Sequence, residues 1–288
     1  MLAFELFVQG LVQGSIYALI AVGLTLVYGL LRILHVAHAG LFTLGGYCGV
    51  LVANATGSLL VALLFAMIVV GFAGMAMYRL CYQPILDKPP YVALIASIGL
   101  FIAMEELFRL IFGPYGLTFD APPLQGRLAI LGVNLKLAEW ATMIGAVIIL
   151  GILALLATRT RLGTAWRATV TVPAMAESFG INILQVRYVN FFVGSALAGG
   201  AGVMVALANL QVEPTMGSVP SYKALAIIVL GGLGNVRGTL IAALALGVIE
   251  SYGTIYLGKL LERDAIAFAF LIIVLMVRPQ GLFAKAGT

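Results

Sequence analysis

Residues 7–31 read FVQGLVQGSIYALIAVGLTLVYGLL and contain no charged residue. A helix needs about 20 mostly apolar residues to cross the hydrocarbon core of a bilayer, so this stretch is long enough to span a membrane. We do not expect a cleavable signal peptide, because Met-Leu-Ala-Phe-Glu at the start offers no basic region and the apolar run is too long. The stretch therefore predicts the first membrane-spanning helix of the fold.

The composition of the whole chain points the same way. Of its 288 residues, 62% are hydrophobic and 9% are charged, whereas soluble domains carry about 25% charged residues. This excludes a soluble enzyme, a nucleic-acid-binding domain and a disordered linker, and it predicts an all-α polytopic membrane protein with no nucleic-acid partner. The net charge of +5 is then a topology signal. We expect Cys48 and Cys81, both in apolar surroundings, to be packing residues rather than a disulfide.

Further apolar segments follow the first one along the chain. Two of them, 37–53 and 222–234, are short and contain several glycines, which predicts glycine-broken or re-entrant half-helices. Neither long polar loop, 113–139 or 158–187, is large enough to bury a core of its own. The prediction is a single membrane domain over residues 1–288 with about eight to nine transmembrane segments; the other segments are 59–80, 91–112, 138–157, 188–210, 238–256 and 265–277.

The basic residues predict the orientation of these segments. If the loop 158–187 is cytoplasmic and the segment 222–234 crosses, alternation places ten Lys and Arg residues inside and five outside, as the positive-inside rule requires. The N-terminus is then outside and the C-terminus inside. The inner set is Arg32, Arg79, Lys88, Arg159, Arg161, Arg167, Arg187, Arg237, Arg278 and Lys285, and the outer set is Arg127, Lys136, Lys223, Lys259 and Arg263.

The loop 158–187 has the residues that begin and end a short helix. Thr171 is a candidate cap, Pro173 suits the first turn, and Gly180 suits the position after the last one. A helix over 173–179 is too short to be stable alone, so it needs a surface to pack on. Met175 and Phe179, spaced i,i+4, fit either a groove on a partner or the chain's own membrane domain, and both interpretations stay open here.

The chain lacks the common motifs of catalysis and energy supply. It contains no G-x-x-x-x-G-K-[ST], no H-E-x-x-H, no cysteine pair with zinc spacing and no G-x-S-x-G, so we expect no catalytic residue, metal site or bound cofactor. Few ionisable residues lie in the predicted spans, which argues against a proton relay. We expect Glu105 to pair with Arg109 at i,i+4, Glu106 to lack a local partner, and Glu250 to find a partner or line water.

Two glycine-containing segments are candidates for a substrate pathway, because irregular backbone at membrane depth is tolerated only where it lines a cavity or packs in protein. The alternative is that these glycines, like the small residues of 194–202, allow close helix packing inside the chain or with a second chain. His35 and His38 are expected to form a pair at a helix boundary near the cytoplasmic interface. The pathway candidates are His38, Gly40, Thr43 and Gly45 in the first segment and Gly231, Gly232, Gly234 and Asn235 in the second.

Four stretches together resemble the permeases of ABC importers for branched-chain (hydrophobic) amino acids, on the LivH side of the LivH/LivM family. They run in the expected order through nearly the whole chain. At 35–39 the sequence His-Val-Ala-His-Ala departs from the family's frequent Asn-Phe-Ala-His-Gly, and Glu105-Glu106 is not expected. The stretches are 14–32 with Ala37-His38 and Gly45-Gly46-Tyr47; the loop with Arg167-Ala168, Ala176 and Gly180-Ile181-Asn182; 196–203; and 230–238 with the tail 278–283.

The resemblance implies a multi-chain importer in a bacterial inner membrane. This chain would pair with a second, LivM-like permease, and a periplasmic or lipid-anchored binding protein would deliver substrate. Two ATPase subunits would bind ATP and magnesium, while this chain binds no cofactor. Alternatives are a family member for urea, amides or small carboxylates, or a passive small-solute channel. The residues expected to couple the chain to the ATPases are Arg167, Pro173, Met175, Ala176, Glu177, Phe179 and Gly180.

Overall fold

The computed structural model describes residues 2–130, 133–258, 262–278 and 281–282. In these residues, seven helices are long and apolar enough to cross a membrane, which confirms an all-α polytopic membrane protein. The third helix continues to Ile85 through a π-helical turn, Tyr78–Tyr82, and a 3-10 turn, Gln83–Ile85. The seven are α1 (Leu2–Leu31), α2 (His38–Thr56), α3 (Leu59–Met77), α4 (Pro90–Phe112), α5 (Leu137–Arg159), α8 (Ile183–Asn209) and α10 (Val236–Tyr256).

The remaining elements are short. Helices α9 (Ser218–Gly231) and α11 (Arg263–Val277) have 14 and 15 residues, about 21–23 Å of helix, against a hydrocarbon core of about 30 Å. The eight to nine crossings therefore depend on these two helices and stay a prediction. The loop after α5 forms α6 (Arg161–Thr171) and α7 (Pro173–Ser178). Strand β1 (Leu117–Thr118) pairs antiparallel with β4 (Gln211–Val212), and β2 (Arg127–Ile130) with β3 (Val133–Lys136).

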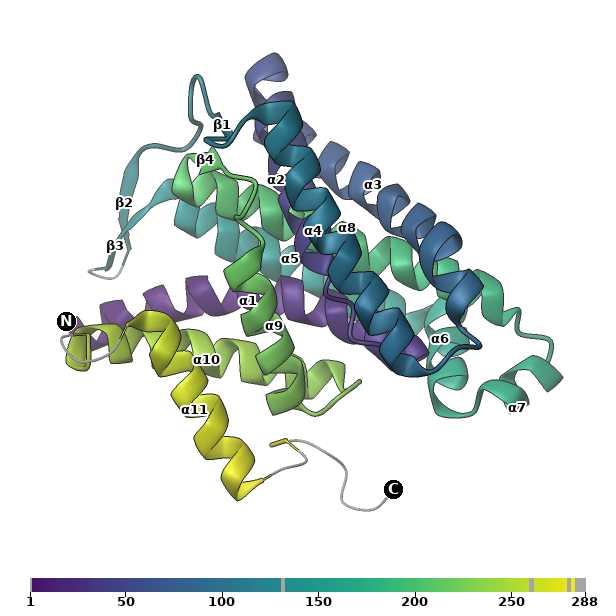
Figure 1. Cartoon of the computed structure of the whole chain (residues 1–288). Helices are drawn as coiled ribbons and strands as arrows, with labels where there is room; N and C mark the ends of the chain where they lie inside the picture. The colour runs from purple at the N-terminus through teal and green to yellow at the C-terminus, as the bar shows by residue number, and fades with distance from the viewer. Residues whose placement is uncertain (1, 131–132, 259–261, 279–280, 283–288) are drawn as a thin grey trace.

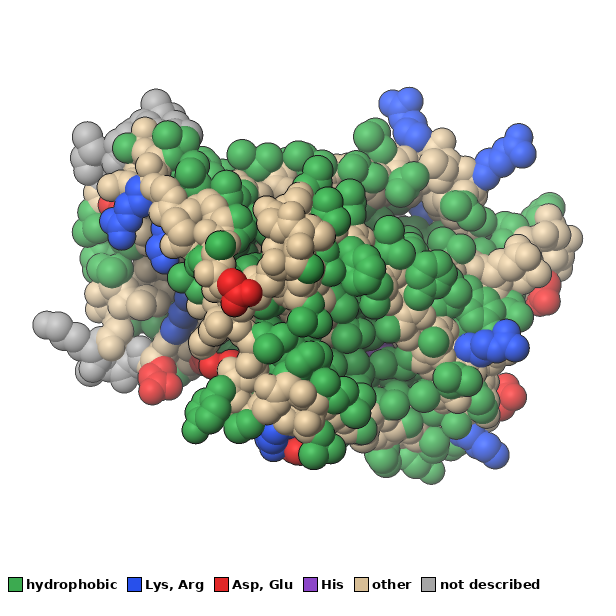
Figure 2. Space-filling model, turned by 90° about the horizontal axis from the view of Figure 1, so that it is seen from above, with side chains coloured by type: hydrophobic (Ala, Val, Ile, Leu, Met, Phe, Trp, Pro, Cys, Tyr) green, Lys and Arg blue, Asp and Glu red, His purple; other side chains and the backbone are tan. Residues whose placement is uncertain are grey.

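The connections gather at two opposite ends of the bundle. At one end lie the N-terminus and the strands, where Asn54 Nδ2 donates to Thr118 O at 3.0 Å. At the other lie α6 and α7 (Figure 1), and there Leu282 N donates to Leu230 O at 2.7 Å. In Figure 2 the charged side chains lie mostly toward these two ends, and the face between them is largely hydrophobic. This distribution fits a bundle whose apolar middle lies in lipid.

Close backbone contacts hold the centre of the bundle together. Helix α1 is largely buried and packs on α10, where a Cβ added to Gly14 would lie 2.8 Å from Leu244 Cα. A Cβ on Gly247 would lie 2.4 Å from the Gly14 nitrogen. Helix α2 meets α8 in the same way, since a Cβ on Gly45 would lie 2.4 Å from Gly199 Cα. Only glycine permits such approaches, which membrane helices use to gain packing contacts.

The sequence had indicated that the glycines of 37–53 break the helix, and this expectation is wrong. Helix α2 is continuous over His38–Thr56, because its glycines face neighbouring helices rather than a turn. The helix nevertheless begins part-way through the bundle. His38 Nε2 lies 3.1 Å from the position of a Cβ on Gly23, eight residues or about 12 Å before the end of α1. Residues 32–37 therefore fold back from the end of α1 toward its middle.

The small-residue run 194–202 serves packing within the chain, and the alternative that it faces a second chain is wrong. All nine residues are buried. A Cβ on Gly194 would meet Gly23 O at 2.8 Å, and a Cβ on Gly202 would meet Phe42 O. The run thus lets α8 lie directly on α1 and α2. Cys48 and Cys81 are free and half-buried, as expected of packing residues.

Gly45→Ala is expected to destabilise the protein by about 1–3 kcal/mol, the usual cost of overpacking, because the added methyl meets the backbone of α8. Gly99→Ala is the control. It is also helical but has open space around its Cβ position, so we expect no loss and a gain of up to about 1 kcal/mol from helix propensity. Thermal unfolding of the two purified variants in detergent measures the difference; equal melting temperatures would contradict the packing role.

Candidate functional site

A polar cavity of about 420 Å³ lies near the end of the bundle that carries the N-terminus. It is bounded by α1, α8, β4, α9 and α11, and its size is in the range of small-molecule sites. Its apolar lining comes from residues including Ile16, Val205, Met216 and Val219, whereas Glu213, Lys223, Arg263 and Asp264 bring charge. The other polar lining residues are Gln13, Tyr17, Asn209, Gln211 and Thr215.

Lys223 is the centre of an ion network in the wall of this cavity. Its Nζ lies 2.9 Å from Glu250 Oε1 and 2.8 Å from Asp264 Oδ1, and it donates to Tyr17 Oη at 2.9 Å. The side chains of Lys223 and Glu250 are 4% and 0% exposed. A buried charge is tolerated only when it is paired and hydrogen-bonded, and the three acceptors around Nζ meet that condition.

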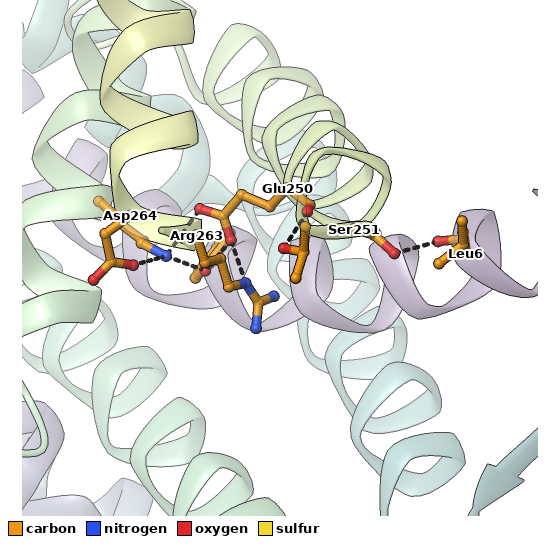
Figure 3. Close-up of polar contacts among 8 residues, drawn as sticks. Leu6, Glu250, Ser251, Arg263 and Asp264 are labelled. Atoms are coloured by element: carbon orange, nitrogen blue, oxygen red, sulfur yellow. Dashed lines mark hydrogen bonds and ion pairs between the residues drawn. The ribbon is translucent and has the colours of Figure 1, made fainter. Parts of the chain in front are cut away.

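Glu250 is held from two further directions. Tyr17 Oη donates to Glu250 Oε2 at 2.7 Å, and Arg263 Nε donates to the same oxygen at 2.9 Å. Figure 3 shows Arg263 beneath the Glu250 carboxylate, with its two terminal nitrogens pointing away from it. Tyr17 belongs to α1, Lys223 to α9, Glu250 to α10, and Arg263 and Asp264 to α11. The network thus ties four helices together at one point.

The expectation that Glu250 finds a partner is confirmed, but the sequence did not name the partners. Assigning Lys223 to the outer loops was wrong, because it lies buried in α9. Its position inside an apolar segment was the available signal, since an intramembrane ionisable residue usually marks a site. The interpretation of Glu106 was also wrong: Arg109 Nη1 donates to it at 2.7 Å and Nη2 donates to Glu105 at 3.4 Å.

The first group of pathway candidates lies on α2 and is buried. His38 lies against Gly23, Gly40 faces the Met104 side chain, and Gly45 faces Gly199. Thr43 Oγ1 donates to Ala39 O at 3.1 Å. None of the four lines the polar cavity. Their contacts are those of close helix packing, and a role in the pathway stays a prediction.

The second group lies at the turn between α9 and α10, at the far end of α9 from the first. Gly232 and Gly234 have positive φ of 92° and 81°, which glycine adopts at little cost. Asn235 Oδ1 caps α10 by accepting from Gly238 N at 3.2 Å. Gly231 packs on the backbone of Thr239. Gly217, the residue before α9, contacts Ala39 and Thr43 of α2, so the first group lies at the start of α9. The second group lies at its end, and the length of α9 therefore separates the two groups by about 20 Å.

His35 and His38 lie inside the bundle. Helix α2 begins at His38, which confirms the expected helix boundary. Both side chains are about 1% exposed, so the expected position at the cytoplasmic interface is wrong. Their ring centroids are 5.6 Å apart, and His35 Nδ1 is hydrogen-bonded to Tyr82 Oη at 2.7 Å. Among the described residues, no three or more His, Cys, Asp or Glu side chains come together as metal ligands do.

The loop after α5 forms two helices rather than one. Helix α7 starts at Pro173 as expected, and Gly180 follows it with a φ of 82°. Thr171 is not its cap; it ends α6, where its hydroxyl donates to Arg167 O. Helix α6 was not predicted, although Thr160, whose Oγ1 accepts from Gly163 N at 3.1 Å, is a sequence signal for its start.

The outer face of α7 is exposed and apolar. Met175 and Phe179 are 58% and 81% exposed, whereas Ala176 between them is buried against the chain. Glu177 is exposed as well. Arg167 donates to the Ala157 carbonyl and so holds α6 against the end of α5. Of the two interpretations of the segment, the exposed Met175 and Phe179 favour a surface offered to a partner.

Comparison with known proteins places this chain in a family. The family model described as "Branched-chain amino acid transport system / permease component" matches residues 6–277. The chain belongs to this family. It is 33% identical to the high-affinity branched-chain amino acid transport system permease protein LivH of Escherichia coli K12, over 96% of this chain and 94% of LivH.

Two other relatives extend this result. The permease protein BraD of Pseudomonas aeruginosa is 29% identical over 96% of this chain and 94% of BraD. LivM of Escherichia coli K12 is 30% identical over only 43% of this chain and 29% of LivM. No solved structure gave a significant match. The resemblance to the LivH-type permeases is therefore confirmed.

In this permease, Lys223→Met is expected to destabilise the fold by about 3–5 kcal/mol, because it leaves the fully buried Glu250 carboxylate without its buried cationic partner. The double variant Lys223→Met/Glu250→Met removes both charges and is expected to recover much of the loss. Thermal unfolding of the three proteins in one detergent provides the measurement. A double variant no more stable than Lys223→Met would contradict this account of the pair.

Proposed function

We propose that this chain is the membrane permease subunit of an ATP-driven importer for branched-chain amino acids. The observation that carries the proposal is the similarity to LivH and BraD over 96% of the chain. The polar cavity inside an otherwise apolar bundle supports it, because transport sites lie in cavities between helices. The chain has no G-x-x-x-x-G-K-[ST] motif, so ATP hydrolysis is assigned to the partner subunits.

The importer needs further subunits. A second, LivM-like permease would pair with this chain, and the partial similarity to LivM supports two related permeases. Two ATPase subunits would hold ATP and magnesium, and this chain would bind no cofactor. A periplasmic or lipid-anchored protein would deliver the amino acid. Apart from membrane lipid, these are the partners that the proposal requires.

The proposed location is the bacterial inner membrane, with the N-terminus outside and the C-terminus inside. Support comes from the distribution of the described basic residues. Nine of them lie at the end of the bundle that carries α6 and α7, and three lie at the opposite end. Lys223, buried in α9, and Arg109, within α4, belong to neither set. The nine are Arg32, Arg79, Lys88, Arg159, Arg161, Arg167, Arg187, Arg237 and Arg278, and the three are Arg127, Lys136 and Arg263.

The segment α6–α7 is proposed to couple the permease to its ATPases. Pro173 starts α7, the turn at Gly180 ends it, and Arg167 fixes α6 to α5. Met175 and Phe179 would then enter a groove on an ATPase, with Glu177 beside them. A helix of six residues needs such a surface because it has little stability of its own.

Transport by the reconstituted complex tests the function. Proteoliposomes with both permeases, the ATPases and the binding protein are supplied with ATP inside and radiolabelled solute outside. We expect uptake of leucine, isoleucine and valine that stops when ATP is omitted. Uptake of urea or a small carboxylate in their place would indicate the alternative family substrates, and flux through this chain alone without ATP would indicate a channel.

Met175→Ala/Phe179→Ala is expected to lower leucine uptake at least tenfold in the same complex, while the permease keeps its melting temperature. Both side chains are exposed, so their loss removes a docking contact and not core packing; tenfold corresponds to about 1.4 kcal/mol of coupling. Tyr115→Ala, which truncates an aromatic residue 89% exposed at the opposite end, is the control. Unchanged uptake in the double variant would contradict coupling through α7.

A further inference from the structure

Arg263 keeps most of its hydrogen-bonding capacity for the cavity. Its Nε is bonded to Glu250 Oε2, while its terminal nitrogens have no partner among the described residues. The side chain is 44% exposed and lines the cavity. In Figure 3 these nitrogens point away from Glu250. A guanidinium fork of this kind binds a carboxylate through two parallel hydrogen bonds.

Two carboxylates in the same lining are also only partly used. Asp264 is 46% exposed and pairs with Lys223 through Oδ1, so its Oδ2 has no partner among the described residues. Glu213 accepts from Gln211 Nε2 at 2.7 Å through Oε1, and within the part of the chain that the structure describes its Oε2 has no partner. Both residues line the cavity. Carboxylate oxygens of this kind accept hydrogen bonds from an ammonium group.

Lys223 and Glu250, by contrast, are paired with each other and with their neighbours. Their role is positional: they fix the start of α11, and therefore Arg263 and Asp264, beside the cavity. In the same lining, Ile16, Val205, Met216 and Val219 add an aliphatic surface. The cavity thus combines an anion-binding fork, acceptors for a cation and an apolar surface.

We propose that this cavity binds the zwitterion of an aliphatic α-amino acid during transport. Arg263 takes the α-carboxylate, Asp264 and Glu213 take the α-ammonium, and the aliphatic lining takes the side chain. The inference rests on the proposed function and deepens it, because it assigns a substrate site to this subunit itself. It also predicts which parts of the substrate the site requires, namely both charges together.

A thiol-protection experiment on the complex of the two permeases and the ATPases tests this site. Val219→Cys, in a background with Cys48→Ala and Cys81→Ala, puts a thiol in the lining without touching the ion network. The complex is placed in lipid nanodiscs without binding protein, so a maleimide reagent reaches both faces. Tyr115→Cys in the same background, exposed and outside the cavity lining, is the control thiol.

The ligands are L-leucine, L-leucinamide, which lacks the carboxylate, and 4-methylpentanoate, which lacks the ammonium. L-leucine is expected to slow labelling at Val219→Cys and to leave Tyr115→Cys unaffected. Each analogue should need at least about a tenfold higher concentration for the same protection, since each loses a charge-assisted contact. No protection by L-leucine, or equal protection by an analogue, overturns the proposal.

Variants of the charged lining give an independent arm. Arg263→Gln and Asp264→Asn should each weaken protection by L-leucine about tenfold. Arg127→Gln, an exposed arginine on β2 outside the lining, should leave protection unchanged. Full protection in both lining variants overturns the proposal. The analogue arm needs neither variant, so a variant that fails to fold does not remove the test.

Leucine uptake by the full importer separates this proposal from the proposed function. ATP-dependent leucine uptake without protection at Val219→Cys overturns the site and leaves the function standing. Protection without uptake supports the site and overturns the function. Loss of both leucine uptake and protection at Val219→Cys overturns both the proposed site and the proposed function.

Discussion

The whole arrangement depends on the direct backbone contact between α1 and α10. Lipid tails are as apolar as leucine side chains, so membrane helices gain little from burying apolar surface and associate through close packing instead. Gly14 and Gly247 let the two backbones touch. This contact sets the register of the pair, and the register brings Glu250 of α10 to the hydroxyl of Tyr17 on α1. A larger residue at either glycine would separate the carboxylate from its partner.

The ion network in turn determines where the short helix α9 lies. A helix of fourteen residues is shorter than the hydrocarbon core, so spanning the bilayer does not by itself fix its position. Contacts position α9 instead: Gly217 against α2 at its start, Lys223 in the network along its length, and Gly231 against α10 at its end. The desolvation penalty of a buried ion pair can offset its Coulombic gain, whereas a register that separates the two charges leaves each of them buried and unpaired. Lys223 and Glu250 therefore act chiefly as a register device for α9, α10 and α11.

The sequence predicted much of the fold because the apolar spans are long and their ends are marked. Spans α1, α3, α4, α5, α8 and α10 lie close to where hydropathy put them. The glycines of α2 were harder to interpret, since the same residue breaks a helix or packs one, and only the neighbour, Gly199, decides which. The cavity was missed for a similar reason. Tyr17, Lys223 and Arg263 are far apart in the chain, and no local pattern shows that Glu250 brings them together.

The looseness of packing at the other end of α9 has a mechanical consequence. A cleft of about 290 Å³ separates Val170 of α6 from Leu233 and Gly234 of the α9–α10 turn. A Cβ on Gly29 would meet only the Val170 side chain there, at 3.8 Å, whereas in the α1–α10 contact an added Cβ would lie 2.4–2.8 Å from backbone atoms. Tightly packed helices move together, whereas a gap accommodates displacement. In an importer driven through α7, the first motion would therefore occur at this cleft, while α1, α9 and α10 move as one body with the charged cavity attached to it.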